Sequence, residues 1–440
     1  MQNARYKSWG LVKPPVQQAE QPSWCPETLD MVGQRTLLPF GNGRSYGDSC
    51  LNSDGVLLDT QSLNRFIHFD ANTGVLEAEP GVLLNDILQQ VVPQGWFLPV
   101  TPGTSYVTLG GAVANDVHGK NHHCDGTFGR FVKQLQVLRS NGDHLTCSAT
   151  ENQDLYCATI GGLGLTGLIT SVVIQLIQIS SADLDVHMNT FSGLDEFQEL
   201  SARYRSDFQY TVAWLDCASA GKNFCRGIFM AANHAHQGEL VASPMAPRFS
   251  IPMNFPRWVL NRYSIRAFNS LYYHKQRSQV TNQQTQHYQG FFYPLDAIGH
   301  WNRIYGAQGF HQYQFVVPFE HASALELILR DIVDSGMGSF LAVLKEFGDI
   351  KSPGLLSFPR PGLCLALDFA DRGSQTVELI KRLDSKVRNV GGAVYPAKDR
   401  LMSVDSFKAY FDQLDTFSAF VDPAFSSDFW RRVAHKSTRS

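Results

Sequence analysis

The sequence predicts an α+β protein with two domains. Its 440 residues, of which 43% are hydrophobic, can bury a sizeable core and exceed the length of one typical domain. Short apolar runs separated by glycine-rich corners predict many strands, and only a few stretches have helical spacing. Near residue 181 the pattern changes to alternating helices and strands with more aromatic residues, and after about residue 390 a loop precedes an amphipathic helix.

The elements of the first part follow from periodicity and turn residues. Helical spacing begins at Val82 and ends at Pro93 and Gly95. A strand pair is expected around the Asn141-Gly142 turn. Further strands are expected in residues 36–40, 55–60, 74–80 and 168–179.

Composition excludes several classes of protein. The formal net charge of −3 gives no overall electrostatic reason to bind nucleic acid. The N-terminus lacks the apolar region of a secretory signal, and no stretch approaches the ~18 apolar residues of a membrane-spanning helix. The eight cysteines form no CxxC pair, which favours reduced thiols. We therefore expect a cytoplasmic protein, either soluble or peripheral at the inner membrane.

Two glycine-rich motifs lead to different expectations. GLGLTG, residues 162–167, has the GxGxxG spacing of a dinucleotide-binding turn, which needs a helix after it to meet the pyrophosphate. The β-branched run after this motif predicts a strand instead, which argues against that site. In GNGRSYGD, residues 41–48, three glycines allow a ligand close to the backbone, and successive N–H groups can hold a pyrophosphate without a helix. An ordinary glycine-rich hairpin is the alternative.

Two further turn-rich segments strengthen the case for a large cofactor. They are TPGTSYVTLGG, residues 101–111, and HGKNHH, residues 118–123. Three small-residue loops on neighbouring strands can surround one ligand. His118, His122 and His123 could instead bind a metal, but no carboxylate or cysteine pair completes a familiar ligand set, so we expect none.

One segment is unusual in charge. Residues 240–295 contain no Asp or Glu. They contain the basic residues Arg248, Arg257, Arg262, Arg266, Lys275 and Arg277 among the aromatic residues Phe249, Phe255, Trp258, Tyr263, Phe268, Tyr272 and Tyr273. Such a composition suits contact with anionic lipid or a phosphate-bearing substrate. A basic loop whose aromatic residues pack on the second domain is the alternative.

The loops also carry a resemblance to a known family. GNGRSYGD, TPGTSYVTLGGAVANDVHGKNHH and IGGLGLTGLI resemble the vanillyl-alcohol-oxidase (PCMH-type) FAD-binding fold and, within it, the decaprenylphosphoryl-β-D-ribose 2′-oxidase family. AWLDC, FFYPLD, FHQYQFVVP, SFLAVLKEFG and YPAKD extend the resemblance along nearly the whole chain. It implies an FAD-binding domain in residues 1–180 and a substrate-binding domain in residues 181–392, with an antiparallel sheet over the isoalloxazine. Residues 393–440 would return to the FAD domain.

The resemblance implies which residues hold the cofactor. They are Gly41, Asn42, Gly43, Arg44, Ser45, Tyr46, Gly47, Thr104, Gly110, Gly111, Asn115, His118, Gly164, Ile169 and Tyr395. Ile169 is expected beside the adenine half. In related sugar oxidases a histidine of the first loop bonds covalently to the flavin. That position is Arg44 here, so we expect FAD to be bound non-covalently.

The resemblance also implies an activity. The family is the flavin-dependent half of a 2′-epimerase, which oxidises the ribose C2 hydroxyl of a polyprenyl-phosphate sugar and so contributes to an arabinan precursor of the cell wall. A separate short-chain reductase completes the inversion. The expected partners are therefore a polyprenyl-phosphate sugar, that reductase and, through residues 240–295, a membrane surface.

Oxidation of a secondary alcohol needs a group that takes the hydroxyl proton. Lys398 of YPAKD matches the essential lysine of the family, and burial or a nearby cation could lower its pKa enough for this role. A surface lysine paired with Asp399 is the alternative. His118 is the second catalytic candidate, or a structural histidine. The residues expected to bind the substrate are Lys120, Trp214, Gln312, Gln314, Lys345 and Lys398, and strand alternation points both glutamines the same way.

One departure from the family affects the expected substrate. Some members have a cysteine at the position of Ala366, whereas Cys364 lies two residues earlier here. Hydride transfer needs no thiol, but the pocket can differ in shape. Two other functions stay open: a soluble polyol or aldonolactone oxidase that uses oxygen, and a flavin-binding redox partner without turnover.

Overall fold

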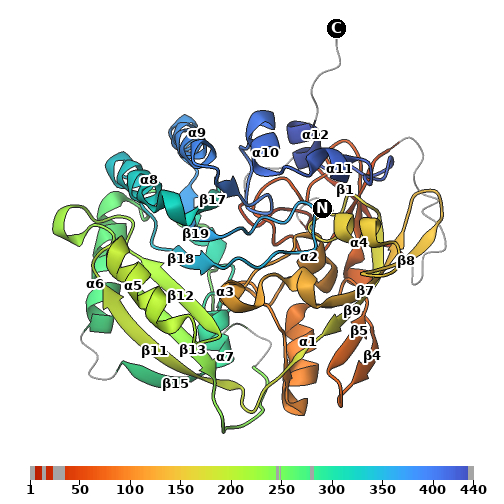
Figure 1. Cartoon of the computed structure of the whole chain (residues 1–440). Helices are drawn as coiled ribbons and strands as arrows, with labels where there is room; N and C mark the ends of the chain where they lie inside the picture. The colour runs from red at the N-terminus through yellow and green to blue at the C-terminus, as the bar shows by residue number, and fades with distance from the viewer. Residues whose placement is uncertain are drawn as a thin grey trace.

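The structure is a computed structural model that describes residues 5–11, 16–22, 35–243, 247, 249–277 and 282–434. Two antiparallel sheets dominate the described residues, and helices pack around both (Figure 1). The smaller sheet belongs to the red-to-yellow part of the chain and the larger to the green-to-blue part. This is the α+β architecture that the sequence predicts.

The first part of the chain forms a five-stranded and a three-stranded sheet. The five-stranded order is β4 (Phe66–Asp70), β5 (Val75–Ala78), β9 (Leu168–Gln175), β7 (Val132–Leu138) and β8 (His144–Ser148). The parallel three-stranded order is β1 (Gln18–Glu20), β3 (Val56–Asp59) and β2 (Leu37–Phe40), and β6 (Trp96–Phe97) pairs with β10 (Ile177–Gln178). The helices are α1 (Leu84–Val91), α2 (Leu109–Ala114), α3 (His122–Asp125) and α4 (Gln153–Thr159).

Local sequence explains several of these elements. In α1, Leu84, Ile87, Leu88 and Val91 recur at helical spacing and are buried, so the helix is held by its apolar face. The chain leaves the helix through a short turn that ends at Gly95, whose φ of 81° favours glycine. The hairpin of β7 and β8 turns at Gly142, with φ of 89°, as the Asn-Gly pair predicts.

The second part forms one eight-stranded antiparallel sheet. Its order is β15 (Gln283–His287), β11 (Asp183–Phe191), β13 (Gly227–His234), β12 (Tyr210–Leu215), β18 (Ala342–Phe347), β19 (Gly362–Ala370), β17 (Phe310–Val317) and β20 (Ala393–Val394). Two short strands, β14 (Phe249–Ser250) and β16 (Ile298–Gly299), pair in parallel. The helices are α5 (Leu194–Tyr204), α6 (Arg262–Arg277), α7 (Tyr288–Phe292), α8 (Ala322–Ser335), α9 (Ser374–Asn389), α10 (Val404–Tyr410), α11 (Leu414–Ser418) and α12 (Asp428–Ala434).

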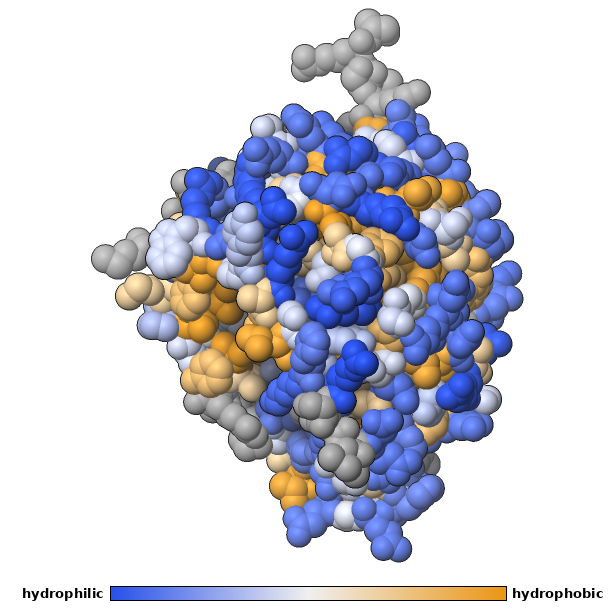
Figure 2. All heavy atoms as spheres, turned by 90° about the vertical axis from the view of Figure 1, so that its left-hand side faces the viewer, coloured by the Kyte–Doolittle hydropathy of each residue, from blue (hydrophilic) through white to orange (hydrophobic). Residues whose placement is uncertain are grey.

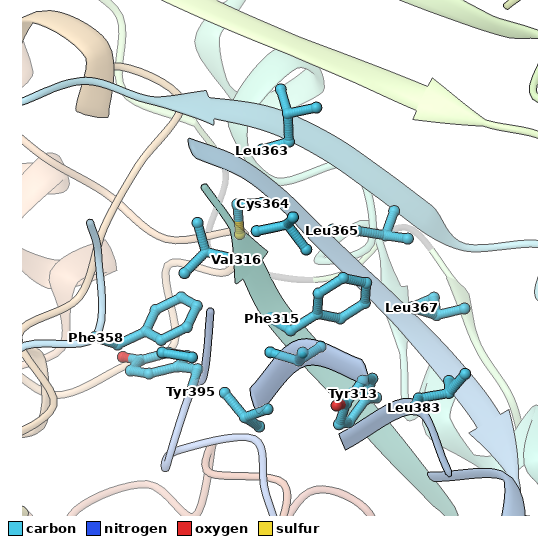
Figure 3. Close-up of a cluster of buried hydrophobic side chains, with 14 of the residues drawn as sticks. Tyr313, Phe315, Val316, Phe358, Leu363, Cys364, Leu365, Leu367, Leu383 and Tyr395 are labelled. Atoms are coloured by element: carbon cyan, nitrogen blue, oxygen red, sulfur yellow. The ribbon is translucent and has the colours of Figure 1, made fainter. Parts of the chain in front are cut away.

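The eight-stranded sheet has two chemically different faces. Odd-numbered residues such as Tyr313, Phe315 and Leu365 enter the main core, where Leu383 of α9 meets them (Figure 3). Even-numbered residues of β17 and β19 point to the other face, because successive side chains of a strand alternate. Register aligns Gln314 with Ala366, Ala366 with Val343 and Val343 with Trp214, so one row crosses four strands. This second face is the floor of the site.

The end of the chain packs against its beginning. Leu37 of β2 forms a parallel bridge with Phe425, and Arg139 forms an ion pair with Asp422 at 3.2 Å. In Figure 1 the blue helices α10 to α12 accordingly lie beside the red and orange segments. These contacts bring the loop after β20 to the glycine-rich loop after β2.

Candidate active site

A cavity of about 1310 Å³ lies between the loops of the first part, the second face of the eight-stranded sheet and α6. Pockets for drug-sized ligands measure roughly 300–1,000 Å³, so this cavity has room for a larger cofactor together with part of a substrate. All but one of the residues expected to bind the cofactor or the substrate line it. The exception is Gly47.

The glycine-rich loop at 41–47 is fixed by contacts with other loops. Asn42 Nδ2 donates to Tyr106 O at 2.8 Å, and the Tyr46 amide donates to Ala397 O at 2.9 Å. Gly43 has φ of 59°, and a Cβ there would lie 2.5 Å from Lys7 O. Gly47 packs outside the cavity, where a Cβ would lie 1.6 Å from Asp399 O. Position 47 must therefore be a glycine, because the neighbouring loop approaches it so closely.

The second loop is held by the start of α2. Thr108 accepts a hydrogen bond from the Gly111 amide at 3.2 Å and so caps the helix. Gly110 lies against Pro80, where a Cβ would be 2.6 Å from the proline ring. At the other end of α2, Tyr395 Oη donates to Asn115 O at 2.8 Å. The loop, the helix and the tyrosine thus form one continuous wall.

The third glycine segment enters a strand. Leu168, which directly follows GLGLTG, begins β9, and Gly164 and Ile169 line the cavity. The expectation of a strand after this motif is confirmed. The motif therefore lacks the helix that a dinucleotide-binding turn of the GxGxxG type requires.

Two buried nitrogens test whether a polar cofactor suits this cavity. Arg44 lies over the rings of Trp9, at 4.1 Å, and Tyr106, at 5.5 Å, and its Nε has no hydrogen-bond partner in the described structure. His118 Nδ1 also lacks one there. Both residues line the cavity. Buried donors normally have partners, so a ligand with acceptor atoms fits these walls.

Lys398 lies in the turn after β20, and its Nζ is 3.9 Å from the ring centroid of Tyr46. Burial lowers the pKa of Lys398 to about 7, with Asp368 raising it and Lys345 lowering it. The alternative of a surface lysine paired with Asp399 is wrong, because Asp399 pairs with Arg432 at 3.0 Å. Lys398 instead lines the cavity with a pKa near neutrality.

His118 and Gln314 meet across the site. The two Nε2 atoms lie 2.6 Å apart, so His118 Nε2 accepts from the amide and its Nδ1 carries the proton. Burial, reinforced by Lys345, lowers the pKa of His118 well below its ordinary value. The imidazole is therefore neutral, and its Nδ1–H is a donor without a partner in the described structure.

Of the other residues expected to bind substrate, Lys345 and Trp214 lie on strands of the floor, and Lys120 lies in the loop before α3. Lys345 Nζ donates to Gly119 O at 3.4 Å, and Lys120 Nζ donates to Phe291 O and lies 4.1 Å from the centroid of the Phe291 ring. Burial lowers the pKa of both lysines, that of Lys120 to about 7. Trp214 is buried and donates from Nε1 to Phe340 O at 3.0 Å. This side of the cavity thus combines two lysines with the broad aromatic ring system of Trp214.

The structure adds residues that sequence reasoning missed. Arg432 binds Asp48 through Nε at 2.9 Å and Nη2 at 2.7 Å, and it binds Asp399 as well. It therefore joins the glycine-rich loop to the Lys398 turn. Asp368 and Tyr305 lie beside Gln312. No sequence motif marks these residues, because each acts through a partner distant in the chain.

The segment at residues 240–295 forms one side of the cavity through α6. Ile265, Phe268 and Tyr272 line the cavity at helical spacing. Exposed apolar side chains on this segment are Val241, Phe249, Met253, Trp258, Tyr263, Phe268, Leu271 and Tyr272. Figure 2 looks at the side where α6 lies and shows hydrophobic side chains gathered at one edge of a mainly hydrophilic surface. Arg248 lies outside the described residues.

Other expectations from sequence concern metals, thiols and membranes. Within the described ranges, no group of three His, Cys, Asp or Glu residues is placed to hold a metal ion. Seven cysteines are free, and Cys25 lies outside the described residues. Among the helices that the structure describes, none is long and apolar enough to cross a membrane.

Comparison with known proteins identifies the class to which this site belongs. Residues 28–148 match the family model of an FAD binding domain. The protein is therefore an FAD-binding oxidoreductase, in agreement with the loops and the unpartnered donors of the cavity.

Whole-chain comparison is more specific. Decaprenylphosphoryl-β-D-ribose oxidase of Mycolicibacterium smegmatis is 34% identical to this chain. The alignment is 452 residues long, gaps included, and covers 98% of this chain and 97% of the relative. The chain belongs to the decaprenylphosphoryl-β-D-ribose oxidase family. An uncharacterised protein in the mprA 5′ region of Streptomyces coelicolor is 30% identical over 80% of this chain and all of the relative. L-gulonolactone oxidase of Scyliorhinus torazame matches at 29% identity over 34% of each chain.

Proposed function

We propose that this FAD-dependent enzyme oxidises the C2 hydroxyl of a polyprenyl-phosphate-linked pentose to the 2-keto sugar. This is the first half of a 2′-epimerisation, and a separate short-chain reductase would complete it. One observation carries the proposal: the large cavity brings Lys398, His118 and the Lys-rich floor together with the FAD-binding loops. The similarity to an oxidase of such a sugar along 98% of the chain supports it.

The cofactor would lie along the loops of the first part. We infer that residues 1–180 and 393–440 hold FAD and that residues 181–392 hold the substrate. The contacts of Leu37 with Phe425 and of Asp48 with Arg432 support this division. Arg44 occupies the position where related enzymes carry a covalently bonded histidine, so FAD would be held without a covalent bond. When bound, FAD accepts the hydrogen that leaves the substrate carbon with its two electrons.

The side chains would orient the alcohol and take its proton. Lys398 is the proposed base, because an amine with a pKa of about 7 is substantially neutral at physiological pH and can accept the hydroxyl proton. The neutral His118 would donate its Nδ1–H to an acceptor, while Gln314 fixes the orientation of its ring. His118 would therefore polarise or position the substrate oxygen, and Lys398 would take the hydroxyl proton.

The floor would hold the sugar and its phosphate. Lys345 and Lys120 offer ammonium donors, which suit hydroxyl and phosphate oxygens. Gln312 lies on the same face of β17 as Gln314, and Trp214 supplies an apolar wall. Burying cations without carboxylate partners is unfavourable, so an anionic substrate group would relieve that cost.

The basic and apolar surface of α6 would meet a membrane. A polyprenyl chain is too apolar to leave a bilayer freely, so an enzyme acting on its headgroup gains from docking there. The acid-free segment at residues 240–295 supports this, because Lys and Arg near an anionic membrane are attracted to it. Val259, Ile265 and Phe268 would then lie between membrane and cavity.

Anaerobic flavin reduction tests the function. Purified enzyme is mixed with a polyprenyl-phosphate ribose, and the absorbance of oxidised flavin is followed. Bleaching with a keto-sugar product is expected, and acid precipitation should release yellow FAD into the supernatant. Bleaching by free polyols or aldonolactones but not by the lipid-linked sugar would favour the soluble-oxidase alternative. The partial match to L-gulonolactone oxidase is the observation that keeps that alternative in the test.

A further inference from the structure

Asp368 is a buried carboxylic acid directly behind the wall of the active-site cavity. It lies on β19 opposite Gln312 of β17, on the same face of the sheet as Ala366. Ala366 and Gln312 line the main cavity, whereas Asp368 does not and is 1% exposed. No ion pair with Asp368 occurs between the residues that the structure describes. A fully buried carboxylic acid without an ion-pair partner is rare and needs an explanation.

Two neutral side chains hold the carboxyl group in place. Gln312 Nε2 donates to Oδ1 at 2.7 Å, and Tyr305 Oη donates to Oδ2 at 3.1 Å. Neither partner neutralises a charge on Asp368. The geometry is therefore that of an acid whose position is fixed but whose protonation state is free to change.

Asp368 also lines a second, small cavity. This cavity measures about 10 Å³, close to the minimum that one water needs, and Tyr305, Ser339 and Arg372 line it with Asp368. Asp368 therefore lies between two spaces. Gln312, which lines the main cavity, is hydrogen-bonded to Asp368, and Arg372, which is exposed, lies on the wall of the small cavity toward the surface.

The titratable groups around Asp368 come from five elements. Lys398 lies in the turn after β20, Cys217 after β12, Tyr46 in the glycine-rich loop, Tyr305 before β17 and Arg372 after β19. Burial raises the pKa of Asp368 to about 7, against the hydrogen bonds of Gln312 and Tyr305 and the charge of Lys398. The pKa of Lys398 is also about 7. Burial thus shifts the pKa of the acid upward and that of the amine downward, so both groups move toward their neutral forms.

We propose that Asp368 is the proton outlet of the active site, receiving the substrate proton from Lys398 and releasing it toward the small cavity. The inference rests on the proposed function, in which the alcohol loses its carbon-bound hydrogen with two electrons to FAD. The substrate O–H bond breaks and an N–H bond forms on Lys398. Lys398 and Asp368 form no hydrogen bond or ion pair in the described structure, so the lysine side chain must swing from the Tyr46 ring toward the carboxyl group. Its N–H bond then breaks as an O–H bond forms on Asp368, and the proton leaves to water. Lys398 is thereby neutral again for the next turnover.

Asp368→Asn tests this, with Asp371→Asn as the matched control. Asp371 lies three residues further along and faces His311 instead of the site. The first readout is the pH midpoint of anaerobic flavin reduction, because only neutral Lys398 accepts the proton and the rate rises through its pKa. Removing the carboxylate removes the interaction that raises the pKa of Lys398. The midpoint of Asp368→Asn should therefore move about one unit or more to lower pH.

The second readout is proton release into weakly buffered solution, followed with an indicator dye during one round of flavin reduction. In the wild type and in Asp371→Asn, release should keep pace with flavin reduction. In Asp368→Asn it should lag about tenfold behind. Tyr305→Phe retains the carboxyl group but removes a link to the small cavity, so release should lag while the midpoint stays. This variant decides the matter if Asp368→Asn does not fold.

The outcomes separate the outlet from the proposed function. An unshifted midpoint in Asp368→Asn overturns the outlet, and so does proton release that keeps pace with flavin reduction in a folded variant. A purely structural role would slow the reaction or raise KM without moving either readout. Flavin reduction that does not depend on Lys398 overturns the proposed function itself. Rescue of the midpoint by Asp368→Glu is expected.

Discussion

The loop wall of the cavity and its α6 wall are built from different chemistry. The loop wall joins residues 41–48 to the Lys398 turn through Arg432, which forms three hydrogen bonds to two carboxylates. On the opposite wall, Asn269 is the buried polar anchor of α6 and donates to Asp216 at 2.9 Å and to Ser339 O at 3.1 Å. Trp258 before the helix and Leu271 within it are 75% and 73% exposed. Reacting atoms need fixed positions, whereas an entrance for a long apolar ligand needs an adaptable surface.

Of the changes that test this difference between the walls, replacing Lys398 should have the largest effect, which is on the rate of flavin reduction. Lys398→Met keeps the apolar stem but removes the amine that takes the proton, so flavin reduction should fall by about 10²–10⁴-fold with FAD still bound. Rapid mixing under anaerobic conditions measures the rate. Lys408→Met, on the exposed side of α10, should react at the wild-type rate. Wild-type reduction by Lys398→Met would remove this lysine from the mechanism.

The second-largest effect should come from removing the Arg432 ion pairs that join the two loops of the loop wall. Arg432→Met leaves Asp48 and Asp399 without their cation, and removing one partner of a mostly buried ion pair costs about 3 kcal/mol. Chemical denaturation should show that loss, and FAD should bind more weakly because both loops lose their link. In Arg382→Met, a side chain that is 53% exposed is removed and Asp331 keeps its second cation, Lys386, so the loss should be about 1 kcal/mol or less. Equal losses in the two variants would show that the loops do not depend on Arg432.

The α6 wall should give the smallest effect on the protein itself. Trp258→Ser and Leu271→Ser together should change the free energy of unfolding by no more than about 0.5 kcal/mol, because both side chains are exposed. Binding to anionic vesicles, measured by co-sedimentation, should fall about tenfold or more. Leu327→Ser on α8, 55% exposed, is the matched control and should bind vesicles normally. Undiminished binding by the α6 variant would exclude this surface as the membrane contact.

Local sequence signals predicted the elements well and the distant contacts poorly. The helix after Val82 and the hairpin at Asn141-Gly142 follow from spacing and turn chemistry, and the structure confirms both. The shared direction of Gln312 and Gln314 follows from strand alternation alone. That both reach the same cavity required the register of four strands, which no window of sequence contains.

Asp368 and Arg432 show why the rest of the site stayed hidden. Asp368 lies in the apolar run of β19, where a single acid has no periodic partner, and Tyr305 is 63 residues away. Arg432 is separated from Asp48 by 384 residues. Gly47 was assigned to the cofactor by its place in the motif, yet its small size serves the close approach of Asp399. In each case the deciding contact joins residues that are far apart in the chain, and such a contact leaves no repeating pattern in the sequence.

The position of Arg432 also affects how the enzyme matures. A ribosome adds roughly 5–20 residues per second, and the N-terminal part of the chain emerges from it first. The glycine-rich loop therefore emerges long before the arginine that ties it to the Lys398 turn. Until α12 has left the ribosome, the contact between the two loops lacks the cation that offsets the like charges of Asp48 and Asp399. Stable flavin capture is thus a late event in biosynthesis, and a nascent chain stalled before residue 432 would be colourless.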